Sequence, residues 1–151
     1  MVITTKIAIN GLQLINKLGI KKDLLDFMNM SVKAQGRIDN LYKEIFVSEG
    51  LLEKEEYTDA DVDRALAKNS DKAKEIENIK AEVEGVGLDL ILTTLIERVP
   101  NCEKDFYKFI TLVSGKTEKQ VSELDISEVV EIVKEVFTSE SFKSFFGVMN
   151  K

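Results

Sequence analysis

The chain has 151 residues, enough for one domain of ordinary size, and 44% of them are hydrophobic. Its formal net charge of −6 gives it no general attraction for nucleic acid or for anionic membrane surfaces, so we expect neither as a partner. One proline and eight glycines supply too little turn chemistry for a sandwich or barrel, which argues against an all-β fold and favours amphipathic helices.

The first 20 residues are compatible with two structures. Val2–Thr5 and Ile7–Ile9 are rich in β-branched residues and partly alternate, as in a short strand. The other structure is a helix, which Thr4 or Thr5 caps and Gly19 ends. Its apolar face comprises Ile7, Ala8, Leu12, Ile15 and Leu18. We favour the helix.

Two further amphipathic helices are predicted before residue 52. The first begins near Lys21 and the second ends near Gly50, with a break between them at Gln35–Gly36. The apolar residues of the first are Leu24, Leu25, Phe27, Met28 and Val32. Those of the second are Ile38, Leu41, Tyr42, Ile45 and Phe46.

Residues 53–84 are dense in charge, with eleven Asp/Glu against six Lys/Arg. Between Leu66 and Ile76 there is almost nothing apolar to bury, so this stretch is predicted to be a loop or a mobile helix. Ile76, Ile79, Val83 and Val86 then alternate at three- and four-residue spacing, like a narrow coiled-coil seam. The seam is either the exposed start of the next helix or a surface that another subunit completes.

The C-terminal half shows helical spacing almost without interruption. Pro100 ends a first helix, because proline removes a backbone donor and displaces the preceding residue from the α region. Ser114–Gly115 ends a second helix. Thr117–Gln120 is a capping box for a short third helix, and Asp125 or Ser127 caps a fourth.

A last helix, capped by Ser139, places three phenylalanines on one face: Phe142, Phe145 and Phe146. Three such side chains are costly to leave in water. They either bind a partner or fold back on the other phenylalanines of this half, which are Phe106, Phe109 and Phe137. We take them as candidate partner-binding residues, with the seam Ile76, Ile79 and Val83 as a second candidate surface.

Together these patterns predict an all-α protein, a compact bundle of short amphipathic helices with a charged central segment. We divide the chain into an N-terminal helical part at 1–52, a charged helical or linker segment at 53–85 and a C-terminal helical part at 86–151. The three parts are expected to form one cooperative domain, because short amphipathic helices need one another to bury their apolar faces.

No pattern in the sequence indicates a reaction centre, a metal site or a cofactor. The chain has no histidine, and its single cysteine, Cys102, lies at an apolar-face position where a buried structural side chain is expected. No run of roughly 18 apolar residues could span a bilayer. Because no reaction centre is indicated, we predict a non-enzymatic protein. A single cysteine is also typical of a reducing compartment, so we predict that the protein is cytoplasmic.

Two short motifs approach known binding loops but fail on spacing. Residues 114–117, Ser-Gly-Lys-Thr, resemble the end of a phosphate-binding loop, yet the glycine required five positions before Gly115 is Ile110. Residues 59–63 alternate aspartates like the start of a calcium loop, but Arg64 and Ser70 stand where that loop needs glycine and glutamate. The aspartates are better placed to favour the first turn of a helix.

The layout of residues 86–149 resembles the small tail assembly chaperones encoded by long-tailed bacteriophages and prophages of Gram-positive bacteria. The features that carry the resemblance are, in order, 86–96 (Val-Gly-Leu-Asp-Leu-Ile-Leu-Thr-Thr-Leu-Ile), Val99–Pro100, Phe106–Tyr107 through 113–117, Val121–Ile126 and Phe142–Phe146. The N-terminal half matches only in length and helical character.

The resemblance implies a helical, non-enzymatic protein that acts in the cytoplasm of the bacterial host and is absent from the finished virion. Such chaperones bind the tape measure protein, keep its apolar helices from aggregating and help bring tail tube subunits to it. Many are also made as a longer, frameshifted product, through which the tail tube protein would be recruited. Self-association is a further expectation for the apolar seam. The alternative is an acidic, all-helical regulatory or interaction module of a phage or prophage that binds a host or phage protein.

Overall fold

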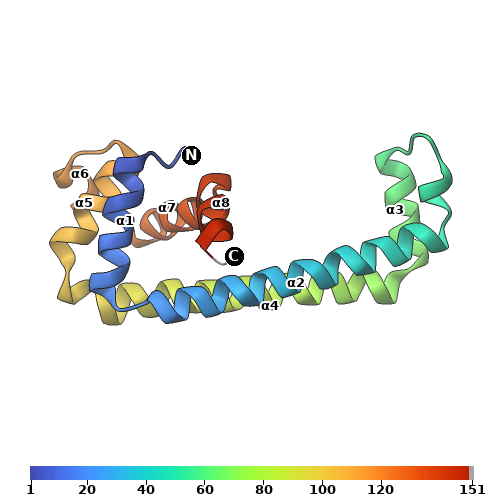
Figure 1. Ribbon diagram of the computed structural model, residues 1–151, viewed down its shortest axis with the longest axis horizontal. Helices are drawn as coiled ribbons and strands as arrows, with labels where there is room; N and C mark the ends of the chain where they lie inside the picture. The colour runs from blue at the N-terminus through green and yellow to red at the C-terminus, as the bar shows by residue number, and fades with distance from the viewer. Residues whose placement is uncertain (150–151) are drawn as a thin grey trace. The chain divides into compact units, whose positions relative to one another are not determined.

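The computed structural model describes residues 1–149, with side chains described as far as Phe145, and this part of the chain is all-α (Figure 1). It contains α-helices joined by short 3₁₀ and π-helical turns, and no strand occurs within residues 1–149. The prediction of an all-α fold is therefore confirmed. None of the helices in this range is long and apolar enough to cross a membrane.

The chain packs into two compact units. Unit 1 comprises Met1–Lys22 and Leu90–Lys151, and unit 2 comprises Asp23–Asp89. Each unit has its own cluster of buried apolar residues. The expectation that the whole chain folds as one cooperative domain stays a prediction.

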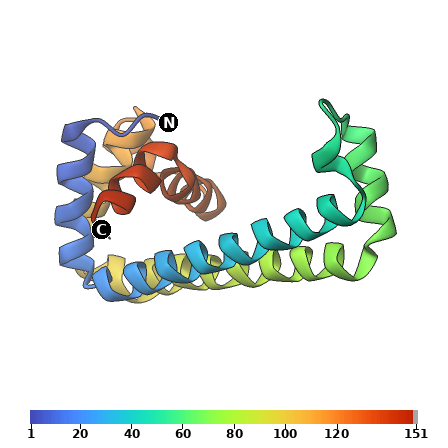
Figure 2. The same ribbon diagram turned by 45° about the vertical axis from the view of Figure 1, so that its right-hand side comes forward.

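Unit 2 is built on two long helices, α2 (Lys21–Ser48) and α4 (Ser70–Thr93), which run side by side (Figures 1 and 2). Ion pairs from Arg37 to Glu75 and from Lys72 to Glu44 show that they are antiparallel, since the partner number falls along α4 as it rises along α2. A 3₁₀ turn, η1 (Leu51–Glu53), and the helix α3 (Asp59–Lys68) connect them. The core consists of Ala34, Ile38, Ile45, Leu51, Ala65, Ile76 and Ile79.

The predicted break at Gln35–Gly36 is wrong, because α2 is continuous from Lys21 to Ser48. Ala34 and Ile38 are buried on either side of Gly36, while Gly36 itself faces open space. Packing of the buried residues outweighs the cost of about 1 kcal/mol for a glycine in a helix. The stretch after Leu66 is helical as well, apart from the turn at Asn69 between α3 and α4.

Unit 1 surrounds a core with five helices: α1 (Thr5–Leu18), α5 (Glu103–Ser114), α6 (Glu118–Ser122), α7 (Ile126–Thr138) and α8 (Glu140–Met149). The end of α4 also belongs to it. Its core cluster consists of Leu14, Leu18, Ile20, Val99, Phe106, Ile110, Val121 and Val129. α5 is central, since it packs against α1, α6 and α7.

The helix boundaries of unit 1 follow the predicted capping residues. Thr4 caps α1, with its hydroxyl accepting from the Ile7 amide at 3.3 Å, so the helical rather than the strand structure is found here. Capping boxes begin α6 at Thr117 and α7 at Asp125. The hydroxyl of Ser139 accepts from the Phe142 amide at 3.2 Å and caps α8.

The helix before Pro100 ends earlier than predicted. Its last α-helical residue is Thr93, after which the backbone widens into a π-helical turn, η2 (Thr94–Arg98), and then tightens into a 3₁₀ turn, η3 (Val99–Asn101). Proline cannot donate the i→i−4 bond and its ring crowds the carbonyl four residues earlier, so the preceding turn departs from α geometry.

Candidate functional site

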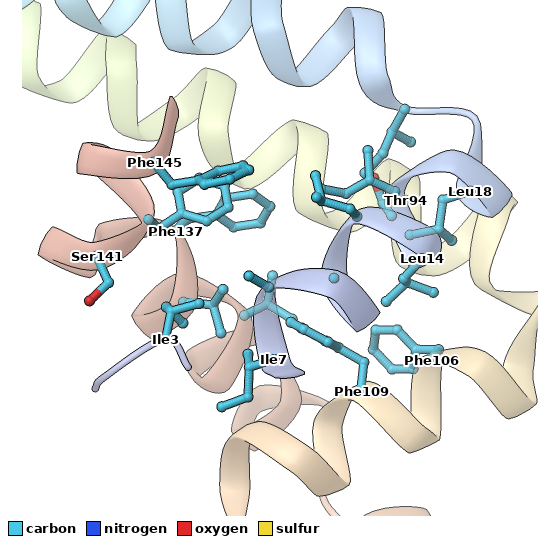
Figure 3. Close-up of a pocket in the computed structure, with 18 of the residues that line it drawn as sticks. Ile3, Ile7, Leu14, Leu18, Thr94, Phe106, Phe109, Phe137, Ser141 and Phe145 are labelled. Carbon is cyan, nitrogen blue, oxygen red and sulfur yellow. The ribbon is translucent and has the colours of Figure 1, made fainter. Parts of the chain in front are cut away.

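Unit 1 contains an apolar cavity of about 590 Å³. Its walls come from α1, the end of α4 with η2, α5, α7 and α8. Figure 3 shows Phe137 and Phe145 on one side of the space, with Leu14, Leu18 and Phe106 on the other. The volume lies within the range of 300–1,000 Å³ that is usual for ligand-binding sites in proteins.

Among the side chains that the structure describes, none that lines the cavity carries a charge. The polar side chains that line the cavity are the hydroxyls of Thr5, Thr94, Ser141 and Ser144. Thr94 already donates its hydroxyl to the Leu90 carbonyl at 2.7 Å. The cavity therefore offers burial to an apolar group and no ion pair to a charged one.

The cavity opens to solvent between α1 and α8. Among its lining residues, Ile9 is 51% and Leu12 is 40% exposed on α1, and Ser144 is exposed on α8. At about 24 cal/mol per Å³, a closed and unfilled space of this volume would cost on the order of 14 kcal/mol, comparable to the whole stability of an ordinary domain. Such a space is stable only if it stays open to water, is filled, or closes by movement of its walls.

The structure brings two of the three candidate phenylalanines to this cavity. Phe142 is buried and packs edge-on against Phe137, with ring centroids 5.1 Å apart, and Phe145 is half-buried at the cavity wall. The side chain of Phe146 lies outside the described residues. Phe106 and Phe109 line the same cavity, so the phenylalanines whose side chains the structure describes in this unit gather around one space, with Phe106 and Phe142 also buried.

The other candidate surface lies in unit 2 and is not brought together with the phenylalanines. Ile76 and Ile79 are 1% and 4% exposed within the unit 2 core, and Val83 is half-buried against it. A partner would reach these two isoleucines only if α2 and α4 separated. Their role in partner binding stays a prediction.

A second cavity, of about 430 Å³, lies in unit 2 beside Ile79 and Val83. It differs in chemistry, because four charged side chains line it: Asp26, Lys33, Arg37 and Glu82. An apolar ligand or helix face would have to remove these charges from water, which is costly. The cavity of unit 1 is therefore the better candidate for an apolar partner.

Sequence reasoning missed the wall that α1 and the end of α4 contribute. Leu12 was placed on the core face of the first helix, and Ile9 on no helical face. In the structure both stand at the cavity mouth. The available signal was the width of the apolar stripe: with Ile9 included, α1 presents more apolar surface than one neighbouring helix can cover.

The motifs that failed on spacing serve as helix caps. The pKa of Asp61 is lowered from 3.8 to about 2, first by the backbone amide of Thr58, then by the Arg64 guanidinium, with smaller contributions from the Thr58 hydroxyl and Lys54. Thr58 and Asp61 form the capping box of α3. No group of three or more His, Cys, Asp or Glu side chains within residues 1–149 could hold a metal ion.

Cys102 is half-buried at the start of α5, where it was expected to be buried within a helix. Burial raises its pKa, the negative charge of Asp105 adds to this, and Lys17 partly opposes it. The thiol therefore stays protonated near neutral pH, and a protonated thiol is a poor nucleophile.

Comparison of the chain with protein-family models, with curated protein sequences and with solved structures found no match to any of them.

Proposed function

We propose that the protein is a phage tail assembly chaperone that binds an apolar helical segment of the tape measure protein in the cavity of unit 1. The observation that carries the proposal is the cavity itself, about 590 Å³, whose described lining consists of aliphatic, aromatic and hydroxyl side chains without a charge. Amphipathic helices bind partner proteins by laying an apolar face into a groove of this kind.

The exposed mouth of the cavity supports the same conclusion. Ile9 and Leu12 are apolar, about half exposed and adjacent to the space, so a bound helix face would cover them. Burial of apolar surface contributes about 25 cal/mol per Å². A long client protein exposes apolar helix faces before assembly. Binding in the cavity would remove those faces from water and so keep the client soluble.

The test is co-expression with the tape measure protein encoded in the same genome. We expect the tape measure protein to become soluble and to co-purify with the chaperone. Leu12→Asp would place a carboxylate at the cavity mouth and should weaken binding at least about tenfold, because burying an unpaired charge costs more than 1.4 kcal/mol. The matched control is Val32→Asp, which changes an exposed apolar residue of α2 outside the cavity.

The outcomes separate the possibilities. If the tape measure protein stays insoluble and unbound while this protein is folded, the chaperone proposal is wrong. If it binds but Leu12→Asp and Val32→Asp have equal effects, the surface is elsewhere. Phe145→Asp and Val83→Asp would then compare the cavity wall with the unit 2 seam.

Recruitment of tail tube subunits through a frameshifted longer product, and self-association, belong to the same proposal. Pull-down with the tail tube protein tests the first, and light scattering of the purified protein tests the second. The proposal also requires that the protein acts in the host cytoplasm and is absent from purified virions, which mass spectrometry of particles would check.

The alternative function, an acidic regulatory module, has one observation in its favour. Unit 2 carries seventeen Asp/Glu against nine Lys/Arg, a formal charge of −8. Several of these acids are engaged by neighbouring cations, among them Glu44, Glu49 and Glu75. A surface that imitates a phosphate backbone needs unpaired carboxylates, so this alternative has the weaker support.

A further inference from the structure

We propose that the protein associates with a second copy of itself by placing an acidic loop of unit 2 on the exposed face of α1 in the other copy. The acidic loop is residues 51–58, which lie between α2 and α3. Ile76 and Ile79 of the predicted seam are buried within unit 2, so self-association at that seam would require α2 and α4 to separate. Contact between the acidic loop and α1 needs no such change, and it does not depend on which client the cavity of unit 1 takes.

The acidic loop exposes two large apolar side chains. Leu52 is 56% and Tyr57 is 48% exposed. The ring of Tyr57 packs against that of Phe46 in α2, with centroids 5.8 Å apart, so the exposed ring is already held in place. Covering a side chain that is already ordered costs little conformational entropy. Leu52 and Tyr57 therefore offer apolar surface that a partner can cover.

The same loop carries negative charge that its own cation does not neutralise. Glu53, Glu55 and Glu56 are exposed, and none of them forms an ion pair with another described residue. The only cation of the loop is Lys54, whose Nζ lies 3.7 Å from the carboxylate of Asp61 at the start of α3. A partner that fits this surface therefore needs both apolar and positively charged groups.

The exposed face of α1 has this chemistry. Ile9 is 51% and Leu12 is 40% exposed, and Lys6 lies three residues before Ile9, where side chains on a helix are neighbours. Residues 1–22 contain four lysines and no Asp or Glu. Lys6 and Lys21 are exposed and form no ion pair within the part of the chain that the structure describes. The face of α1 in one copy thus matches the acidic loop of another in both polarity and charge.

The net charges of the two units favour the same pairing. Unit 2 has a formal charge of −8, whereas unit 1 carries twelve Lys/Arg against ten Asp/Glu, a formal charge of +2. Opposite charges attract unit 1 of one copy to unit 2 of another, while two copies of unit 2 repel each other. Because few apolar groups take part, we expect a small interface and reversible association, with a Kd of roughly 0.1 mM.

Self-association would cover part of the unit 1 cavity mouth. Ile9 and Leu12 belong both to the exposed face of α1 and to the lining of the cavity. A client that covers these two residues would therefore compete with the second copy. Only this competition rests on the proposed function.

The experiment measures the mass of the purified protein by sedimentation velocity at about 0.3 mM protein, in about 20 mM and in about 0.5 M salt. Lys6→Glu changes the face of α1 and should not impair folding, because a carboxylate in the first turn of a helix is favourable. A second variant, Glu55→Lys with Glu56→Lys, changes only the acidic loop.

Each variant has a matched control with the same change in net charge at exposed positions outside both surfaces. For the α1 variant the control is Lys116→Glu, in the connection between α5 and α6. For the loop variant it is Glu84→Lys with Asp89→Lys, in the second half of α4. The controls separate a contact at these two surfaces from an effect of net charge alone.

We expect dimers or larger species in low salt and a monomer in high salt. The α1 variant and the loop variant should each weaken self-association about fivefold or more, and each control less than about twofold. An equal mixture of the two variants should associate again, because each keeps the surface that the other has lost.

A protein that stays monomeric in low salt would overturn the proposal. So would controls that weaken association as much as the variants, or a mixture of variants that stays monomeric. If the protein self-associates as expected but the tape measure protein does not bind, the self-contact stands and the proposed function fails. If the tape measure protein binds to a protein that is monomeric in low salt, the reverse holds.

Discussion

The two units start from the same kind of sequence and reach different interiors. In unit 2, the long helices α2 and α4 pair along their length, and Ile45 and Ile76 are 0% and 1% exposed between them. In unit 1, several short helices meet around α5 and leave a cavity of about 590 Å³. Two long antiparallel helices can pair their apolar stripes over most of their length, and the cavity of about 430 Å³ that remains in unit 2 is lined in part by charged side chains. Short helices joined by tight turns cannot all approach one another, and the space they leave in unit 1 is apolar. The space left between short helices is the feature that suits unit 1 for binding.

The largest expected effect tests whether the unit 2 interior is a core. Ile76→Ala should lower the free energy of unfolding by roughly 2–5 kcal/mol, because a fully buried side chain leaves a cavity that its neighbours cannot fill. Urea unfolding followed by circular dichroism would measure it. Val32→Ala, at a position 68% exposed, is the control and should change stability by less than about 0.5 kcal/mol.

The same variant tests the prediction of one cooperative domain. α4 supplies Ile76 to the core of unit 2 and Ile91 to the cavity wall of unit 1. Unfolding of unit 2 should therefore also disrupt the part of that wall which α4 provides. Hydrogen exchange should therefore accelerate in α5 as well as in α2. Unchanged hydrogen exchange in α5 would show that the two units unfold independently. A small loss of unfolding free energy in Ile76→Ala would instead favour a role for Ile76 at an interface.

The next effect compares the same substitution in both interiors. Ala65 is 2% exposed in the unit 2 core, so Ala65→Leu should overpack it and cost about 1–3 kcal/mol. Ala8 lines the unit 1 cavity, where a larger side chain has space, so Ala8→Leu should change stability by less than about 0.5 kcal/mol. Ala8→Leu should also reduce the amount of a neutral apolar dye, such as Nile red, that the cavity binds. Equal losses of stability at both positions would mean that the unit 1 cavity is closed in solution.

Much of the local structure could be predicted from the sequence. The caps at Thr4, Thr117, Asp125 and Ser139 depend on hydrogen bonds within one turn, so nearby residues determine them. The continuity of α2 through Gly36 could not be predicted, because it depends on packing against α4, which is distant in sequence. Local patterns are reliable where the interaction itself is local.

The cavity could not be predicted for a different physical reason. A side chain that lines a cavity has the same helical spacing as one that fills a core, as Phe106 and Phe145 illustrate. Whether the space between them closes depends on the directions in which short helices leave their turns. The sequence indicated that Phe142 and Phe145 were important but left their role as core or binding surface open.

A smaller effect comes from glycines inside helices. Gly36 of α2 faces open space, so Gly36→Ala should stabilise the protein by about 0.5–1 kcal/mol through the higher helix propensity of alanine. Gly11 of α1 is different, because an added Cβ would lie 3.2 Å from Cε2 of Phe109 and the ring would have to shift. Gly11→Ala should therefore gain less. Thermal unfolding of the two variants measures the difference, and a larger gain at Gly11 would show that Phe109 moves freely into the cavity.

The smallest effect distinguishes the capping carboxylates of the two units by their response to acid. The lowered pKa of Asp61 in unit 2 means that its charged form favours the folded state. This contribution is complete above the ordinary value of 3.8 and is lost as the pH falls toward 2. The pKa of Asp125 in unit 1 is also lowered, by the Ser127 amide and then by the Ser127 hydroxyl, so its contribution is lost on acidification in the same direction.

Added salt should affect the pKa values of the two carboxyl groups differently. Only the pKa of Asp61 depends on neighbouring cations, which are Arg64 and Lys54. Carboxyl ¹³C NMR titration should show that added salt raises the pKa of Asp61 and leaves that of Asp125 in place. Arg64→Gln should raise the pKa of Asp61 only part of the way to 3.8, because the Thr58 amide is the larger cause and is retained. A wild-type Asp61 that titrates near 3.8 would mean that the capping box of α3 does not form in solution.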